Sequence, residues 1–289
     1  MNNFHTPVLL QEVLNGLQIV PEKKYIDATI GGGGHSFEIL KQGGLVLGID
    51  VDTEALEFAR GRWKIECRNW NIEEQNLILA KGNFRDIDKI AHLNNFEKVK
   101  GIIFDLGVSS HQIDKASRGF SFQKEGPLDM RMSQDLQVKA LDLVNALNKG
   151  ELYEIFTKLG EEGGARAISE HIIRARSVEP IKTTSDLAKL IRPSARPKIF
   201  QALRIAVNDE LNAIRAALPK AYELLESRGR ILAISFHSLE DRIVKQQFIE
   251  FENENKGRII TKKPIVPSSE ERQRNRRSRS AKLRIYEKN

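Results

Sequence analysis

Hydrophobic and polar residues alternate along the chain with two different periods, and the order of these periods predicts an α/β fold. Apolar residues recur every three or four positions over 9–17 and from about residue 53 past 63, which predicts amphipathic helices. Short apolar runs between the helical patterns predict strands over 25–28, 45–50, 76–80, 101–105 and 230–235. Strands and helices that alternate in this way are typical of a doubly wound sheet, which binds its ligand at the carboxyl ends of the strands.

The alternation stops after residue 110. Residues 111–207 contain helical patterns and loops but no convincing strand. A predicted helix over 200–211 returns the chain to the sheet, with one apolar stripe made of Phe200, Leu203, Val207, Leu211 and Ile214. We therefore expect a discontinuous domain of residues 1–110 and 208–289, interrupted by an inserted helical domain of residues 111–207. Near the end, 258–266 and 281–286 predict an antiparallel pair of strands.

Composition places the chain among cytoplasmic globular proteins. It has 289 residues, 40% of them hydrophobic, and no run apolar enough to cross a membrane. The N-terminus lacks the basic and apolar regions of a signal peptide. The single cysteine, Cys67, cannot form an internal disulfide, and six scattered histidines with one cysteine suggest no metal site. We expect neither a membrane segment nor a metal.

The net charge of +7 belongs to the C-terminal segment. Residues 256–289 hold 12 Lys or Arg against 3 Asp or Glu, whereas the remaining residues hold 34 against 36. A stripe this basic suits a polyphosphate backbone and predicts a nucleic-acid partner. Charge alone fits a solvated, partly disordered tail equally well, although the alternation in 282–286 favours a strand.

A glycine loop after the first predicted strand indicates which cofactor the sheet binds. The dinucleotide fingerprint G-x-G-x-x-G fails here, because counting from Gly31 and Gly33 its last position falls on Ser36. The pattern Asp27-x-Thr29-x-Gly31-x-Gly33 instead resembles the first motif of S-adenosylmethionine-dependent methyltransferases, with Thr29 in place of a glycine. A glycine-rich turn in an unrelated α/β protein is the alternative.

Loops after the other strands carry further candidates. Each has a structural explanation: Asp50 can cap a helix, Phe84 can pack in the core, and His237 can serve the turn before a capping-box-like Ser238-Leu-Glu-Asp241. A carboxylate at the tip of the second strand is also placed to accept hydrogen bonds from a ribose diol. Because the carboxyl ends of the strands share one crevice, the candidates together predict a ligand site.

Eight longer segments resemble one family, the MraW (RsmH) methyltransferases of small-subunit ribosomal RNA. They include Asp105-Leu-Gly-Val-Ser-Ser110 and Leu128-Asp-Met-Arg-Met132, and they occur in the family's order at 5–10, 27–35, 105–110, 118–122, 128–132, 200–205, 235–242 and 277–284. The resemblance implies a Rossmann-like class I methyltransferase with an inserted all-α domain. It also implies a bacterial cytoplasmic enzyme that uses S-adenosylmethionine to methylate N4 of a cytidine in the decoding centre of 16S rRNA, in the small ribosomal subunit.

The same resemblance assigns the cofactor contacts by position. They fall on Gly33, Gly34, His35, Asp50, Phe84, Asp105 and Gln112. Asp50 would hold the ribose hydroxyls, Phe84 would lie against the adenine, and Asp105 and Gln112 would close the methionyl side. The sequence identifies no catalytic residue and leaves the oligomeric state open.

Two other functions fit parts of the sequence. A DNA amino-methyltransferase commonly has a D/N/S-P-P-Y/F motif after the fourth strand, where this chain has Asp105-Leu-Gly-Val. A non-catalytic RNA-binding or ribosome-assembly factor would need no intact cofactor site, so cofactor affinity distinguishes it from an enzyme. Phe120 and Phe122, in the inserted domain, either stack on RNA bases or pack in a core.

Overall fold

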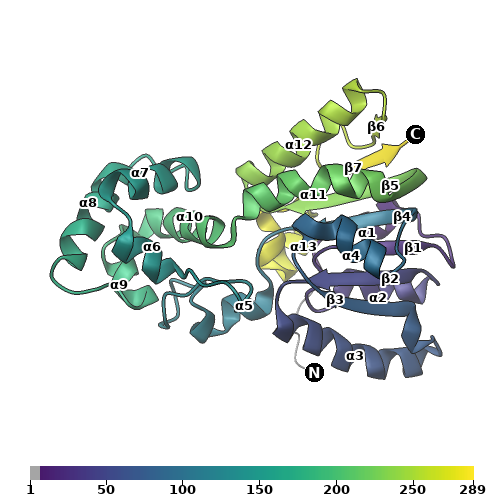
Figure 1. The fold of residues 1–289 in the computed structure, drawn as a ribbon, viewed down its shortest axis with the longest axis horizontal. Coiled ribbons are helices and arrows are strands. Elements are labelled where there is room, and N and C mark those ends of the chain that lie inside the picture. Colours follow the sequence, from purple (N-terminus) through teal and green to yellow (C-terminus); the bar gives the residue numbers. More distant parts are fainter. Residues whose placement is uncertain (1–6) are drawn as a thin grey trace. The chain divides into compact units, whose positions relative to one another are not determined.

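The strands form one mixed sheet. A computed structural model describes residues 7–289, so His5 and Thr6 of the 5–10 motif lie outside the described residues. Seven strands pair in the order β3-β2-β1-β4-β5-β7-β6 (Figure 1). All neighbours from β3 to β5 are parallel, whereas β7 pairs antiparallel with both β5 and β6. The strands are β1 Lys24–Asp27, β2 Leu45–Asp50, β3 Leu77–Lys81, β4 Val99–Asp105, β5 Leu225–Ser235, β6 Gly257–Ile259 and β7 Lys282–Lys288.

This order confirms the predicted Rossmann-like class. The chain winds outward from β1 to β3 and then returns to place β4 beside β1, which creates the crevice of a doubly wound sheet. The predicted strands all exist, but two have different extents. β5 begins at Leu225, with a register shift opposite Val99 and Gly101. β6 covers three residues only, and Ile265 adds an isolated bridge to Leu283.

Helices on one side of the sheet share a single apolar core with it. Buried side chains of α1 (Leu10–Leu17), α2 (Gly34–Lys41) and α3 (Thr53–Trp70) cluster with alternate strand residues such as Leu232 and Ile234. That alternation follows from the period of two along a strand. The remaining elements around the sheet are α4 Ile87–Leu93, α11 Glu210–Leu224, α12 Ser238–Asn253, α13 Ser269–Arg274, and the 3-10 helices η1 Glu74–Asn76, η2 Phe84–Asp86 and η5 Arg276–Ser280.

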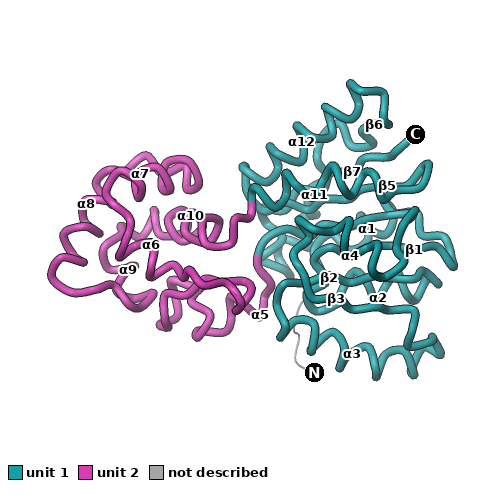
Figure 2. Tube along the Cα trace, in the orientation of Figure 1, with its two compact units in different colours: residues 1–107, 211–289 teal, residues 108–210 magenta. Residues whose placement is uncertain are grey.

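The chain divides into two compact units (Figure 2). Unit 1 contains residues 1–107 and 211–289, and unit 2 contains residues 108–210. Within the described residues unit 2 has no strand, and it packs around its own apolar cluster, which includes Phe156, Ile172 and Leu203. Its elements are α5 Ser110–Asp114, η3 Ala116–Arg118, α6 Ala140–Ala146, α7 Lys149–Lys158, α8 Ala165–Arg176, α9 Thr184–Lys189, η4 Pro193–Ala195 and α10 Arg196–Asn208. No helix within residues 7–289 is long and apolar enough to span a membrane.

The single helix predicted over 200–211 is wrong in extent, because the structure has two helices there. α10 ends at Asn208, and Asp209 takes a left-handed conformation with φ of 51° before α11 begins. The predicted stripe is divided accordingly: its first three residues pack in the core of unit 2, and its last two are buried in unit 1. Apolar spacing continues across the break because each helix buries a face of its own, and no Gly or Pro marks the junction.

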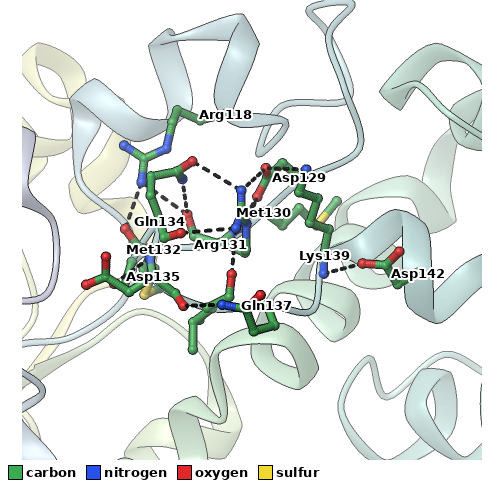
Figure 3. A network of polar contacts seen from close by, with 12 residues as sticks. Arg118, Asp129, Met130, Arg131, Met132, Gln134, Asp135, Gln137, Lys139 and Asp142 are labelled. Atoms are coloured by element: carbon green, nitrogen blue, oxygen red, sulfur yellow. Dashed lines mark hydrogen bonds and ion pairs between the residues drawn. The ribbon is translucent and has the colours of Figure 1, made fainter.

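The loop before α6 is held by a network of polar contacts (Figure 3). The guanidinium of Arg131 donates two hydrogen bonds to the carboxylate of Asp129, each 2.8 Å long. The buried Arg118 donates to the carbonyl of Arg131 at 3.1 Å, and Asn208 donates to the carbonyl of Met130 at 2.8 Å. These contacts hold buried Met130 at φ of 62°, a conformation that costs a non-glycine residue about 1–3 kcal/mol.

The two phenylalanines after Arg118 are packed within unit 2. Both are half-buried against its apolar cluster. The ring of Phe122 meets that of Phe200 edge-on, with centroids 5.5 Å apart. The structure therefore favours packing over RNA stacking for Phe122, and Arg118 belongs to the loop's scaffold.

Candidate functional site

Three aspartates end three neighbouring parallel strands. Asp27 is the last residue of β1, Asp50 of β2 and Asp105 of β4, and β1 lies between the other two. Burial raises the pKa of each carboxyl to about 6, and the charge of Asp27 raises the pKa values of Asp50 and Asp105 further. Buried acids that repel one another favour a positively charged ligand, which stabilises their ionised forms.

The glycine loop leads from β1 into α2. Gly31 has φ of 50° and Gly33 has φ of 79°, in the left-handed region that glycine adopts most readily. A Cβ on Gly33 would lie 2.6 Å from the ring of Phe37, so packing also excludes a side chain there. Gly33 is the N-cap of α2 and supplies no side-chain cap, so the first turn of this helix can offer backbone N–H groups to a ligand.

Asp27 and Thr29 fix this loop, although neither is among the predicted contacts. Asp27 is buried, and its carboxylate accepts from the N–H of Thr29 at 3.2 Å and from the hydroxyl of Ser36 at 2.7 Å. The hydroxyl of Thr29 in turn accepts from the N–H of Asp105 at 2.7 Å. Thr29, which replaces a glycine of the motif, thus ties the loop to the end of β4 by a contact that glycine cannot make.

Asp50 lies between the glycine loop and α3. Its Oδ2 accepts from the N–H of Gly31 and its Oδ1 from the N–H of Asp52, both at 2.9 Å. The N-cap of α3 is Asp52, so the alternative role of Asp50 as the side-chain cap is wrong. Each oxygen of Asp50 retains a second lone pair, which suits a pair of ligand hydroxyls.

His35 and Asp105 form the opposite side of the same loop. His35 is buried, and its Nε2 lies 3.0 Å from the carbonyl oxygen of Val8, to which a protonated Nε2 donates. Its Nδ1 lies 3.8 Å from Oδ2 of Asp105. Oδ1 of Asp105 is buried without a hydrogen-bond partner among residues 7–289. Leaving such an oxygen unpaired is costly, so it fits a ligand with an ammonium or other strong donor.

The other two predicted contacts have different surroundings. Phe84 begins η2 and is half-buried, with its ring edge-on to Phe104 at a centroid distance of 5.8 Å. It is therefore packed on one side while part of it stays accessible. Gln112 belongs to unit 2, where its Oε1 accepts from the N–H of Ser109 at 3.0 Å in the capping box of α5. Its contact with the cofactor stays a prediction.

Sequence reasoning missed Arg62. This side chain of α3 lies over the ring of Phe37, with 4.7 Å between the guanidinium carbon and the ring centroid, and donates to the carbonyl of Gly32 at 3.3 Å. It therefore supports the glycine loop from outside. Nothing in the sequence distinguishes Arg62, because α3 carries several other charged residues at helical spacing.

The helix after β5 is capped one residue earlier than predicted, by His237. Its Nδ1 accepts from the N–H of Glu240 at 3.4 Å, and the Glu240 carboxylate accepts from the N–H of Phe236 at 2.8 Å. His237 thus serves the turn before α12, as its structural explanation supposes.

The basic C-terminal residues separate into a structural group and an exposed group. Arg284 is buried and binds Asp241 at 2.6 Å, while Arg258 and Arg230 both bind Glu287 at 2.6 Å. The predicted terminal strand is confirmed as β7. The exposed arginines lie on α13 and η5, and they are Arg272, Arg274, Arg276 and Arg279.

Comparisons with known proteins agree with the resemblance seen in the sequence. A family model described as the MraW methylase family matches residues 2–289. A protein from Clostridium botulinum (strain Loch Maree / Type A3) named ribosomal RNA small subunit methyltransferase H is 43% identical, over 98% of both chains. A protein of the same name from Fusobacterium nucleatum subsp. nucleatum is 42% identical, over 99% of this chain and 98% of its own.

Solved structures resemble the chain more remotely. An rRNA methylase from Streptococcus thermophilus is 13% identical with a TM-score of 0.46, covering 98% of both chains. An O-methyltransferase from Bacillus cereus in complex with SAH is 9% identical with a TM-score of 0.45, covering 97% of this chain and 79% of its own. These likenesses are too distant to support an argument. The family match spans nearly the whole chain, and membership in a methylase family supports the expectation of S-adenosylmethionine as cofactor. The chain therefore belongs to the MraW methylase family.

Proposed function

We propose that this protein transfers a methyl group from S-adenosylmethionine to a base of small-subunit ribosomal RNA. The observation that carries the proposal is the row of buried carboxylates Asp27, Asp50 and Asp105 beside a left-handed glycine loop. S-adenosylmethionine carries a sulfonium and an ammonium, and ionised carboxylates stabilise both charges. Its ribose hydroxyls also need acceptors at the tip of the second strand, where Asp50 stands.

The predicted contacts then have distinct roles. The backbone of Gly33, Gly34 and His35 would approach the methionyl end, and Asp50 would accept from the two ribose hydroxyls. Phe84 would cover one face of the adenine. Asp105 would accept from the ammonium through its unpartnered Oδ1, with Gln112 beside it.

The finer target follows from the family resemblance: N4 of a cytidine in the decoding centre of 16S rRNA, methylated in the cytoplasm. S-adenosylmethionine would supply a methyl carbon on positively charged sulfur. The N4 lone pair attacks this carbon, the carbon–sulfur bond breaks with its electron pair going to sulfur, and the nitrogen loses a proton. The protein's own contribution is to hold the two reactants in line and to exclude water, which is where much of the rate of such transfers originates.

The exposed arginines support an RNA substrate. Arg272, Arg274, Arg276 and Arg279 form a dense positive surface suited to phosphates. Unit 2 would select the target within the small ribosomal subunit. The target base has to leave its stack to reach the methyl group, as in other base-modifying enzymes.

Mass spectrometry of 16S rRNA nucleosides, from cells with and without the gene, tests the proposal. We expect methylation on N4 of one cytidine to disappear without the gene and to return with the wild-type gene. The Asp50→Asn variant should restore it poorly, whereas Glu57→Gln should restore it fully, since it removes one charge from an exposed position on α3. An unchanged nucleoside profile in cells without the gene would contradict the proposal.

A further inference from the structure

We infer that Glu271 is a positioning residue that joins the exposed arginines of the C-terminal segment to the cofactor loop. The inference rests on the proposed function. It adds that RNA held on α13 and cofactor held by the glycine loop act on one another through Pro7, Val8 and Leu9, here called the linking segment. All of these residues belong to unit 1.

The first contact joins α13 to the linking segment. Oε1 of Glu271 accepts from the N–H of Leu9 at 2.9 Å, although the two residues are 262 positions apart. Ser268 is the N-cap of α13 and accepts from the N–H of Glu271 at 3.1 Å, so Glu271 stands where the acid of a capping box would stand. Its carboxylate reaches across to another helix instead, where a negative charge at the N-terminus of α1 is favourable.

The strained backbone of Leu9 shows that this contact fixes the linking segment. Leu9 is fully buried and has φ of 54°, a left-handed conformation that costs a leucine about 1–2 kcal/mol. It is also the N-cap of α1 and provides no side-chain cap of its own. Such a conformation persists only where surrounding contacts determine it, and Glu271 supplies the acceptor for its N–H.

The second contact joins the linking segment to the cofactor loop. The carbonyl of Val8 lies 3.0 Å from Nε2 of His35, whose Nδ1 faces Asp105 at 3.8 Å. Pro7 packs on Gly34, where an added Cβ would lie 3.0 Å from the proline ring. Movement of the linking segment would therefore change the orientation of His35 and the space beside Gly34.

The arginines and Glu271 share one short structural segment. Arg272 and Arg274 follow Glu271 on α13, and Arg276 and Arg279 lie on η5 directly after it. Buried Ser278 anchors η5, with its hydroxyl donating to the carbonyl of Asn275 at 2.8 Å. Phosphates that bind these arginines would hold α13 in place, and with it Glu271 and the linking segment.

Two ligands that favour the same arrangement bind with positive coupling, and the coupling is reciprocal. We expect small ribosomal subunits from cells without the gene to raise the affinity of the protein for S-adenosylhomocysteine by about five-fold or more. Equilibrium dialysis with and without the subunits measures this factor. In Glu271→Ala the factor should fall to about one, while each ligand still binds alone.

Matched variants separate positioning from charge. Glu270→Ala removes the same charge from the neighbouring exposed position and should keep the wild-type coupling. Glu271→Gln keeps an acceptor oxygen for Leu9 and should keep most of it. If Glu271→Ala melts far below the wild type, Ser268→Ala serves instead, because it loosens the N-cap of α13 without removing Glu271, and it should lower the coupling.

The outcomes are distinct. Equal coupling in the wild type and in the folded test variant overturns the inference, as does a wild type that binds both ligands independently. Equal loss in Glu270→Ala and Glu271→Ala overturns it as well, because charge alone would then explain the effect. A wild type that binds no cofactor overturns the proposed function itself, and the inference with it.

Discussion

At the scale of single residues, the site depends on carboxylates that the fold makes costly to ionise. The sequence was sufficient to predict the glycine loop and Asp50, because both follow apolar strands directly. It could not predict Arg62 or Glu271, whose roles come from partners far along the chain. Thr29 was recognised only as a departure from the motif, and its bond to the end of β4 requires the paired strands to be seen.

Replacing Asp50 tests the ribose contact. Charge-assisted hydrogen bonds to two hydroxyls contribute roughly 1.5–3 kcal/mol, so Asp50→Ala should weaken S-adenosylmethionine binding by about one to two orders of magnitude. Isothermal titration calorimetry measures the affinity, and circular dichroism should show an unchanged fold. An unaltered affinity would remove Asp50 from the site.

The raised pKa values predict how cofactor binding depends on pH. Burial raises the pKa of Asp27, Asp50 and Asp105 to about 6, so these carboxyls become protonated as the pH falls through about 6. The affinity for S-adenosylmethionine should therefore decrease between about pH 8 and about pH 5. The folded pKa lies above the ordinary value of 3.8, so their contribution to stability has the opposite trend: it is complete below 3.8 and is lost as the pH rises through about 6. Calorimetry across this range should show both trends, and a flat affinity profile would count against the carboxylates.

At the scale of elements, periodicity predicted what each segment forms better than where it ends. The strands before residue 110 lie where apolar runs predicted them. The break at Asp209 was missed because the apolar stripe serves two cores in succession, and the start of β5 was missed because 225–229 includes Glu226 and Arg228. In the C-terminal segment, charge density indicated a single basic face, whereas Arg284 and Arg258 are bound to acids.

The exposed basic elements α13 and η5 should carry the electrostatic part of RNA binding. Replacing Arg274, Arg276, Arg277 and Arg279 by Ala should weaken RNA binding and flatten its salt dependence by up to about 0.7–0.9 in log–log slope for each phosphate that the variant no longer neutralises. Filter binding at several salt concentrations measures the slope, and the affinity for free cofactor should hardly change. A slope equal to that of the wild type would assign these elements a purely structural role.

The contact between the loop after η3 and α10 predicts a stability effect. Phe122→Ala removes a half-buried ring that meets Phe200, which should cost about 1–3 kcal/mol and lower the melting temperature by several degrees. Phe122→Leu should be less destabilising, because most of the apolar area remains. Unchanged melting together with abolished methylation of RNA would support stacking on a base instead.

At the scale of the whole molecule, the two units have separate apolar cores. The core of unit 1 joins α1, α2 and α3 to the sheet, and the core of unit 2 contains only residues between 128 and 207. Sequence alone predicted an insert near these boundaries, since the strand pattern stops at one side and resumes at the other. Six of the seven predicted cofactor contacts belong to unit 1, and Gln112 is the exception.

Hydrogen exchange should therefore respond to the cofactor in one unit more than in the other. S-adenosylmethionine at a concentration 100 times its Kd stabilises the unit that binds it by about 2.7 kcal/mol, which slows exchange through global unfolding of that unit by about 100-fold. We expect this slowing for the amides of β1, β2 and β4, and a much smaller change for α7, α8 and α10. Asp50→Asn gives the control, because it should abolish the effect at the same cofactor concentration. Equal protection in both units would mean that they unfold as one, and that the cofactor stabilises the RNA-selecting unit as strongly as the sheet.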